Sequence, residues 1–289
     1  MLASKLSKRL ANHLSGIDIQ RYSRVSPSRL AESALPKIGL IELVSAEDFS
    51  QLYDELYTAM FPHQGERERS SLIVERLQKE FAGCRQNLAP YRIIGIRDYE
   101  GKAIGAAQFS VLLLAGNKYA VPYVQYIYVR EKNRRQDMAE LLHTLTLAVA
   151  TADAAQRTVP FELFETEPPN HGDDENRKTN ATQRALIHAK AGAIAIMLHR
   201  PNDGALISPH VQPGLEIGDP PLSLVWAIRP SPAITDKNID IVELGLTLVA
   251  AYYQSLRDEG FPEANIRVAE EIVALEDELS ADYTSTMTA

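Results

Sequence analysis

The sequence has little cysteine, no long apolar run and no excess of basic charge. Its single cysteine, Cys84, cannot form a disulfide within the chain and lacks the neighbours of a metal or redox motif, so we expect a reduced thiol. No apolar stretch approaches the roughly 20 residues that cross a bilayer, which predicts that a membrane is not a partner. The net charge of −8 predicts that nucleic acid is not a partner either.

What is present is the composition of an ordinary globular protein. The 289 residues are 45% hydrophobic and 24% charged, and they suffice for one large domain or two small ones. Together with the lone thiol, this composition predicts a cytoplasmic protein.

Residues 1–37 differ from the rest, because they are basic and poor in acidic groups. We expect them to form a flexible N-terminal extension. A basic, serine-containing segment with an amphipathic start also fits a mitochondrial transit peptide, so the alternative location is the mitochondrial matrix. The segment lacks the apolar stretch of a secretory signal. Its charged residues are Lys5, Lys8, Arg9, Asp18, Arg21, Arg24, Arg29, Glu32 and Lys37.

From residue 38 onward, hydrophobic periodicity predicts an α/β (α+β) fold. Strands are expected at 38–43, 91–96, 103–114, 120–129, 159–166, 193–198 and 222–228. Helices are expected at 46–60, 70–81, 138–153, 181–190, 239–256 and 264–279. Ser45 and Asp48 are typical of a helix start, and Gly101 is typical of a tight hairpin. The pattern predicts a core domain over residues 38–230 and a C-terminal helical extension over residues 231–289.

One strand–loop–helix segment carries a motif. Its sequence is Tyr126-Ile-Tyr-Val-Arg-Glu-Lys-Asn-Arg-Arg-Gln-Asp-Met-Ala-Glu-Leu-Leu142. This segment and the order of elements over residues 37–230 resemble the GNAT acyltransferases, which transfer an acyl group from coenzyme A to an amine. The resemblance implies a mixed, twisted sheet flanked by helices. Arg134 and Ala139 match the family's pattern, and Asp137 stands where its first glycine belongs.

The resemblance implies acetyl-CoA or another acyl-CoA as co-substrate. Backbone groups of Ile127 and Val129 would bind the pantetheine arm. Successive N–H groups at a helix N-terminus suit a pyrophosphate, aided by the helix dipole. The residues that would hold it are Arg134, Arg135, Gln136, Asp137, Met138 and Ala139. The carboxylate of Asp137 would face the phosphates unless it caps the helix; alternatively, Asp137 is an ordinary N-terminal helix residue in a turn without an anion.

The same resemblance assigns catalytic roles. His188 has the spacing to Lys190 and Gly192 that the family gives to a tyrosine which protonates the leaving thiolate, a role that imidazole can fill. Strand alternation places Glu165 and Glu167 on one face, where either could accept the amine proton.

Each of these assignments has a simpler alternative. The alternative for His188 is a partly exposed helical residue without a catalytic role. The alternative for the glutamates is that they are solvated or pair with Arg184. Gln125 and His63 are expected near the acceptor amine. The role expected of Gln125 is to order a water molecule, because an amide cannot act as a base. A lone loop histidine such as His63 also fits an ordinary surface position.

The leading hypothesis is an N-acyltransferase that acts by direct attack of the amine on the thioester. The alternatives are a non-catalytic GNAT-like binding or regulatory module, and an acyltransferase that takes its donor from an acyl carrier protein. The acceptor would be a small-molecule or peptide amine, and the C-terminal helices could join two copies of the chain. No metal site is expected, because the polar run with His171 and Asp173 lacks convergent spacing.

Overall fold

The computed structural model describes residues 2–63, 67–85, 88–116, 118–199, 206–222, 224–234, 241–277 and 283–284. The chain forms two compact units. Unit 1 contains Met1–Pro160 and Ser231–Lys237, and unit 2 contains Phe161–Pro230 and Asn238–Ala289. The division therefore falls after residue 160, whereas the sequence predicts boundaries at 37 and 230. Each unit combines helices and strands, which confirms the α/β class.

The basic N-terminal segment is folded into unit 1. It contains the helices α1 (Lys8–His13) and α2 (Pro27–Glu32), whose first turns are capped by the side chains of Ser7 and Ser26. Leu10 and Leu30 are buried, and the backbone N–H of Ser7 donates to the carbonyl of Ile41 at 2.7 Å. The segment is therefore packed on the domain rather than extended from it as a flexible tail.

Four strands form the sheet of unit 1, in the order in which they occur along the chain. They are β1 (Leu40–Leu43), β2 (Tyr91–Arg97), β3 (Ala103–Leu113) and β4 (Ala120–Val129). All three pairings are antiparallel. The β2–β3 turn closes as predicted, with Gly101 at φ +81°. A parallel bridge joins Tyr119 to Thr158 beside the start of β4, so the sheet is mixed as expected.

Helices cover both faces of this sheet. The predicted helix at 46–60 is observed as α3 (Ala46–Asp48), a π-helical turn and α4 (Asp54–Met60), and it begins with a capping box between Ser45 and Asp48. It is followed by α5 (Ser70–Phe81) and, after β4, by α6 (Met138–Asp153), both with the predicted bounds.

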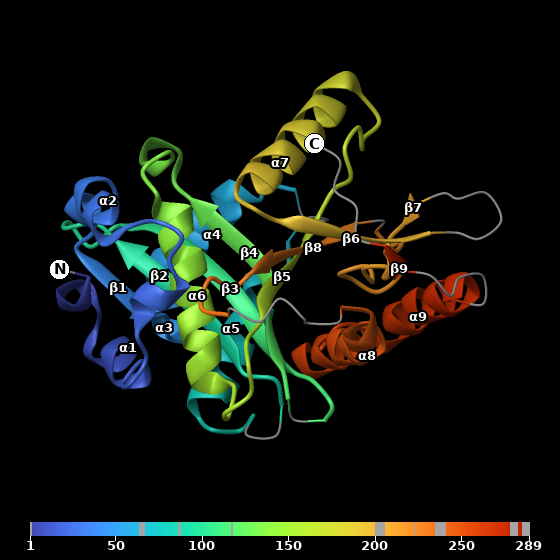
Figure 1. Cartoon of the computed structure of the whole chain (residues 1–289), viewed down its shortest axis with the longest axis horizontal. Helices are drawn as coiled ribbons and strands as arrows, with labels where there is room; N and C mark the ends of the chain where they lie inside the picture. Colours follow the sequence, from blue (N-terminus) through green and yellow to red (C-terminus); the bar gives the residue numbers. More distant parts are fainter. Residues whose placement is uncertain are drawn as a thin grey trace. The chain divides into compact units, whose positions relative to one another are not determined.

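Two glycines show which helix covers which face. A Cβ on Gly95 would lie 2.3 Å from the Tyr53 ring, and one on Gly105 would meet Leu142 of α6 at 3.6 Å. Gly95 and Gly105 belong to consecutive cross-strand pairs, so they face opposite sides of the sheet. The helices from α3 to α5 therefore pack on one face, and α6 runs across the other (Figure 1).

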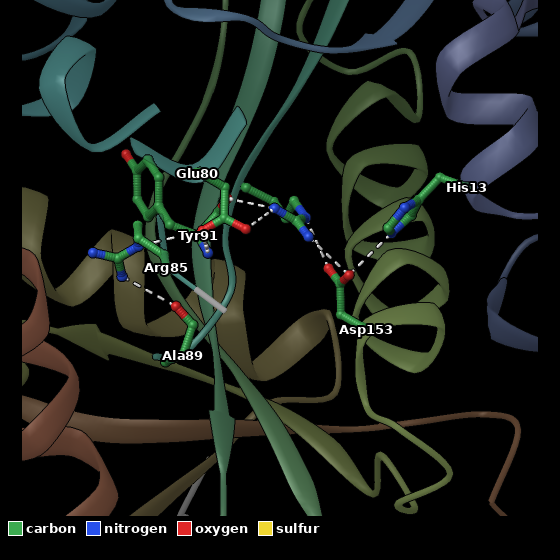
Figure 2. Close-up of polar contacts among 7 residues, drawn as sticks. His13, Glu80, Arg85, Ala89, Tyr91 and Asp153 are labelled. Carbon is green, nitrogen blue, oxygen red and sulfur yellow. Dashed lines mark hydrogen bonds and ion pairs between the residues drawn. The ribbon is translucent and has the colours of Figure 1, made fainter. Parts of the chain in front are cut away.

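A charge network joins α1, α5, β2 and α6 within unit 1 (Figure 2). The Arg92 guanidinium donates to Asp153 through Nε and Nη2, both at 2.9 Å, and also pairs with Glu80. His13 Nε2 lies 3.2 Å from Asp153 Oδ1. Burial alone would raise the pKa of Asp153, but hydrogen bonds from His13 and Arg92 outweigh it and hold that pKa below its usual value. A cavity of about 380 Å³ beside the network is lined in part by Arg9 and Phe81.

Unit 2 contains a second set of antiparallel strands. They are β5 (Phe161–Thr166), β6 (Ile194–His199), β7 (Leu206–Ile207), β8 (Val225–Pro230) and β9 (Tyr283–Thr284). Strand β8 pairs with both β5 and β6, and β6 pairs in addition with β7 and β9.

The helices of unit 2 are α7 (Glu175–Lys190), α8 (Ile241–Glu259) and α9 (Glu263–Asp277). Helix α7 begins six residues earlier than predicted, because Asp174 caps it by accepting from the Arg177 N–H at 2.8 Å. Residues 168–174 are therefore loop, and residues 175–180 are helix. Gly192 follows α7 at φ +80°, as predicted for a helix end. The predicted limits at residues 239 and 279 lie outside the described residues.

Among the described helices, none is long and apolar enough to cross a membrane.

Candidate active site

The loop between β4 and α6 keeps an unusual backbone. Arg135 has φ +59° and Asp137 has φ +55°, so two non-glycine residues adopt the left-handed conformation. Such a conformation costs an L-residue about 1–2 kcal/mol. Asp137 is the position at which the family pattern has glycine. The backbone here has the left-handed conformation, which glycine adopts without strain and aspartate adopts at a cost in free energy.

This loop presents backbone donors at the start of a 16-residue helix. The first hydrogen bond of α6 runs from the Leu141 N–H to the Asp137 carbonyl at 2.9 Å, so the N–H groups of Met138 and Ala139 have no acceptor within the helix. Arg135 is exposed, and Arg134 closes the loop by donating from Nε to the Val129 carbonyl at 3.2 Å. The loop has the donors and the helix dipole that bind an anion.

The Asp137 side chain is held by the N-terminal segment. Arg29 of α2 donates from Nε to Oδ2 at 2.8 Å and from Nη2 to Oδ1 at 2.6 Å, a bidentate pair. The Asp137 side chain makes no capping hydrogen bond to α6. The hydrogen bond from Arg29 keeps the pKa of Asp137 below its usual value. The carboxylate therefore neither caps the helix nor stands alone; its charge is balanced by an arginine.

Strand β4 contains a bulge at Gln125. Gln108 pairs with Tyr126 and Phe109 pairs with Val124, so Gln125 is the extra residue, and its side chain is half-buried. A bulge bends its strand and increases the local twist.

The direction of the backbone groups near the end of β4 follows from its pairing with β3. The Arg130 N–H donates to the carbonyl of Ile104 in β3 at 2.8 Å, and alternate residues of a strand direct their backbone groups to opposite edges. The backbone groups of Ile127 and Val129 therefore point away from β3.

His63 is exposed and follows an aromatic cluster at the end of α4. Phe61 packs edge-on against Tyr126, with ring centroids 5.0 Å apart, and Tyr57 does the same at 5.1 Å. Tyr126 of β4 thus packs against aromatic side chains at the end of α4. The exposed position of His63 fits both the acceptor role and the simpler surface interpretation.

In unit 2, Glu165 belongs to a buried polar cluster. Its Oε1 lies 2.6 Å from His210 Nε2 and accepts from the Tyr252 hydroxyl at 2.8 Å. Glu165 pairs with Trp226 across β5 and β8, which places both side chains on one face of the sheet. His210 stacks on Trp226 with centroids 4.4 Å apart and an interplanar angle of 18°.

The other predicted catalytic residues of unit 2 lie outside this cluster. Glu167 forms an ion pair with Arg184, the alternative that the sequence leaves open. The His188 ring packs against Phe164 at 4.8 Å. Phe164 and Glu165 are consecutive residues of β5 and point to opposite faces. The structure therefore groups Glu165 with His210 on one face and places His188 on the other.

Groups of three or more side chains arranged to hold a metal ion are absent from the part of the chain that the structure describes.

The strand–loop–helix segment and the order of elements agree with those that the resemblance to GNAT domains predicts. No family model matches the chain, and no curated protein sequence matches it. Solved structures do match. One is yncA from Salmonella typhimurium with its cofactor acetyl-CoA, at 13% identity, covering 69% of this chain and 96% of that one, with a TM-score of 0.39.

Two further matches are longer proteins. A tandem GNAT protein from the clavulanic acid biosynthesis pathway is 16% identical, with 55% of this chain and 46% of that one covered and a TM-score of 0.37. A fungal multi-domain β-N-acetylglucosaminidase with a glucosamine N-acetyltransferase region is 12% identical, with 57% and 18% covered and a TM-score of 0.35. The chain thus spans less than half of either protein. At these TM-scores, function has to be inferred from the chain's own residues.

Several residues of these sites were not predicted from the sequence. Arg29 is one of several charged residues in the basic N-terminal segment, and Tyr252 lies in the predicted helix at 239–256, where nothing in the local sequence distinguishes it. His210 and its neighbour Ser208 lie in a Pro- and Gly-containing connection that resembles an ordinary loop. The spacing Ser-Pro-His was the available signal, because residues two apart in an extended segment point to the same side.

Proposed function

We propose that the chain is an acyl-CoA-dependent N-acyltransferase that transfers an acetyl or other acyl group to an amine by direct attack on the thioester. The observation that carries this proposal is the loop at residues 134–139. It joins a bulged strand to a long helix, it has two left-handed residues, and it ends at a helix N-terminus whose first N–H groups have no acceptor within the helix.

In this proposal the loop binds the pyrophosphate of acetyl-CoA or another acyl-CoA. The N–H groups of Met138 and Ala139 would donate to phosphate oxygens, and the exposed Arg135 adds positive charge. Because Arg29 balances the charge of Asp137, the repulsion expected from a bare carboxylate is reduced. The backbone groups of Ile127 and Val129 would bind the pantetheine arm.

Acid and base roles are proposed for unit 2. Glu165 or Glu167 would accept the amine proton, and His188 would protonate the leaving thiolate. Glu165 and His188 lie on opposite faces of β5, so they can serve one reaction only if the bound thioester passes the end of that strand. The two roles therefore need separate tests.

The remaining assignments follow from the same proposal. The acceptor would be a small-molecule or peptide amine near His63 and Gln125. We propose a cytoplasmic location, with the mitochondrial matrix as the alternative if residues 1–37 act as a transit peptide. Pairing of two chains through the C-terminal helices is a further proposal.

A non-catalytic GNAT-like module is the second candidate, and the Arg29–Asp137 pair favours it. Two side chains that satisfy each other at the cofactor loop are what a domain without a cofactor would keep. Binding separates the two hypotheses, because an enzyme must bind acyl-CoA.

The first experiment is calorimetric titration with acetyl-CoA, longer acyl-CoAs, free CoA and pantetheine. The proposal expects binding of acetyl-CoA that weakens about tenfold or more in Arg135→Glu, because a charge-assisted phosphate contact becomes a repulsion. Lys102→Glu is the matched control, since it makes the same charge change in the exposed β2–β3 turn. Absence of binding at millimolar ligand favours the non-catalytic module, and binding of pantetheine as tight as that of CoA favours a carrier-protein donor.

The second experiment measures turnover in His188→Phe, Glu165→Gln and Glu167→Gln with an amine acceptor. A positioned acid or base is worth about 10²–10⁴-fold in rate. The proposal expects a loss of that size for His188→Phe and for one glutamate variant, with acyl-CoA affinity retained. Activity close to normal in all three variants removes these roles.

A further inference from the structure

A hydroxyl, an imidazole and a carboxylate are joined in series in unit 2. Ser208 Oγ lies 3.0 Å from His210 Nδ1, and His210 Nε2 lies 2.6 Å from Glu165 Oε1. An ionised carboxylate only accepts hydrogen bonds, so Glu165 places the ring proton of a neutral His210 on Nε2. Nδ1 is then the acceptor, and it faces the hydroxyl of Ser208.

Burial differs along this series. His210 is fully buried, and the Glu165 side chain is 8% exposed. Ser208 is half-buried, so it is the member of the series most open to a ligand. Trp226 stacks on one face of the imidazole, and Tyr252 meets it edge-on at 5.4 Å. The histidine is therefore fixed in orientation.

A donor without a partner lies in the same cluster. Trp226 Nε1 is buried and has no hydrogen-bond partner among the described residues. A buried N–H group left unpaired costs about 1–3 kcal/mol. A ligand with a carbonyl oxygen would supply the acceptor that this indole lacks.

We propose that Ser208 is the nucleophile of an acyl-transfer site, with His210 as its general base and Glu165 as the residue that orients and stabilises the imidazole. This goes beyond N-acylation, because it needs neither an amine nor the loop at residues 134–139. The substrates would be activated acyl esters or thioesters. A nucleophile, a base within hydrogen-bond reach and a third group that orients the base define such a site.

The proposed reaction has two steps. Ser208 Oγ attacks the acyl carbon and passes its proton to His210 Nδ1, while Glu165 balances the imidazolium through the Nε2–H. The carbon–oxygen bond to Ser208 forms, the bond to the alkoxide or thiolate breaks, and that leaving group takes the proton from Nδ1. Water then attacks the acyl carbon and gives a proton to His210 Nδ1. The bond between that carbon and Ser208 Oγ breaks, Oγ takes the proton back from Nδ1, and the carboxylic acid leaves.

The experiment labels the full chain with a fluorophosphonate probe, which reacts with activated serines, and locates the label by peptide mass spectrometry. The proposal expects label on Ser208 and none on Ser50. Ser50 is an exposed serine in the π-helical turn between α3 and α4, and its hydroxyl donates to the Ala46 carbonyl. Unfolding the wild-type chain in urea before labelling should abolish the reaction. This comparison needs no variant and so does not depend on how a variant folds.

Variants then test the series. Hydrolysis of p-nitrophenyl acetate should fall to the uncatalysed level in Ser208→Ala and by about 10²–10⁴-fold in His210→Gln and Glu165→Gln. Ser50→Ala is the matched control and should retain the wild-type rate. Equal labelling of Ser208 and Ser50, or hydrolysis that survives in Ser208→Ala, overturns the proposal. The assays contain no CoA and no amine, so their failure leaves the N-acyltransferase proposal to its own tests.

Discussion

Asp137 and Glu165 are both carboxylates at proposed sites, and the protein treats them in different ways. Asp137 meets Arg29, whose side chain is 64% exposed and always charged. Glu165 meets His210 and Tyr252 in the interior of unit 2, and both partners can lose or gain a proton. The charge of Asp137 is balanced by an exposed arginine, whereas Glu165 is hydrogen-bonded to a buried imidazole and a tyrosine hydroxyl.

The comparison shows what a partner does for an acid. An exposed ion pair contributes little to stability because solvent screens it, so the main effect of Arg29 is to balance the charge of Asp137 in the loop. The hydrogen bonds of a buried carboxylate are costly to break, because they leave buried polar groups without a partner, and such a carboxylate can take part in proton transfer. The predictions below test this difference, in order of decreasing effect.

The largest effect is expected for Glu165→Leu. It leaves the His210 imidazole and the Tyr252 hydroxyl without their acceptor in a buried site, so unit 2 should lose about 2 kcal/mol or more. Trp226 is the only tryptophan of the sequence, and urea unfolding followed by its fluorescence therefore reports unit 2. Asp137→Leu is the comparison variant and should shift this transition little. A loss below about 1 kcal/mol for Glu165→Leu would remove the contrast between the two carboxylates.

A smaller effect is expected for Tyr252→Phe, which deletes a single hydrogen bond to Glu165. The same fluorescence transition should shift by about 1 kcal/mol, since the other contacts of the ring remain. A loss as large as that of Glu165→Leu would mean that the tyrosine, and not the histidine, is the main partner of the carboxylate.

Asp137→Gly should tighten CoA binding a few-fold. Glycine adopts the left-handed conformation without strain, and the substitution removes a negative charge from the phosphate loop. Loss of the exposed pair with Arg29 and relief of backbone strain have opposite signs, so the net change in stability should be small. Calorimetry with CoA and thermal unfolding measure the two effects. Weaker binding would show that the aspartate and Arg29 help to form the loop.

The smallest effect concerns pH. Because Arg29 holds the pKa of Asp137 below 3.8, the pair stabilises the fold above that pH, and its contribution is lost as the pH falls through the lowered pKa. In Arg29→Ala the Asp137 carboxyl should titrate closer to 3.8, as followed by carboxyl NMR signals. An unchanged titration would show that Arg29 does not set this pKa.

Most of the fold could be predicted from the sequence because its signals are local. Ser45 with Asp48, Gly101 and Gly192 each act within a few residues, and the helices at 70–81 and 138–153 have the predicted bounds. The start of α7 was missed because its first two turns are polar and carry no apolar stripe. Asp174 was the available signal, as an N-cap residue.

The polar clusters could not be predicted in the same way, because their members are distant in the chain. Arg29 and Asp137 are 108 residues apart, and Glu165 is 87 residues from Tyr252. No periodicity connects such positions, and only the folded chain brings them together. Glu165 was identified as a candidate residue. Its partners His210 and Tyr252 lie in a loop and in a helix, and nothing in their local sequence connects them to this strand.

The left-handed backbone at Asp137 has a consequence for how this loop can change over generations. Every aspartate codon becomes a glycine codon by substitution of its middle base. The backbone already has the conformation that glycine prefers, so this mutation needs no rearrangement of the chain before it can take effect. At this position the sequence is therefore one point mutation from glycine, and the backbone already has a conformation that glycine adopts without strain.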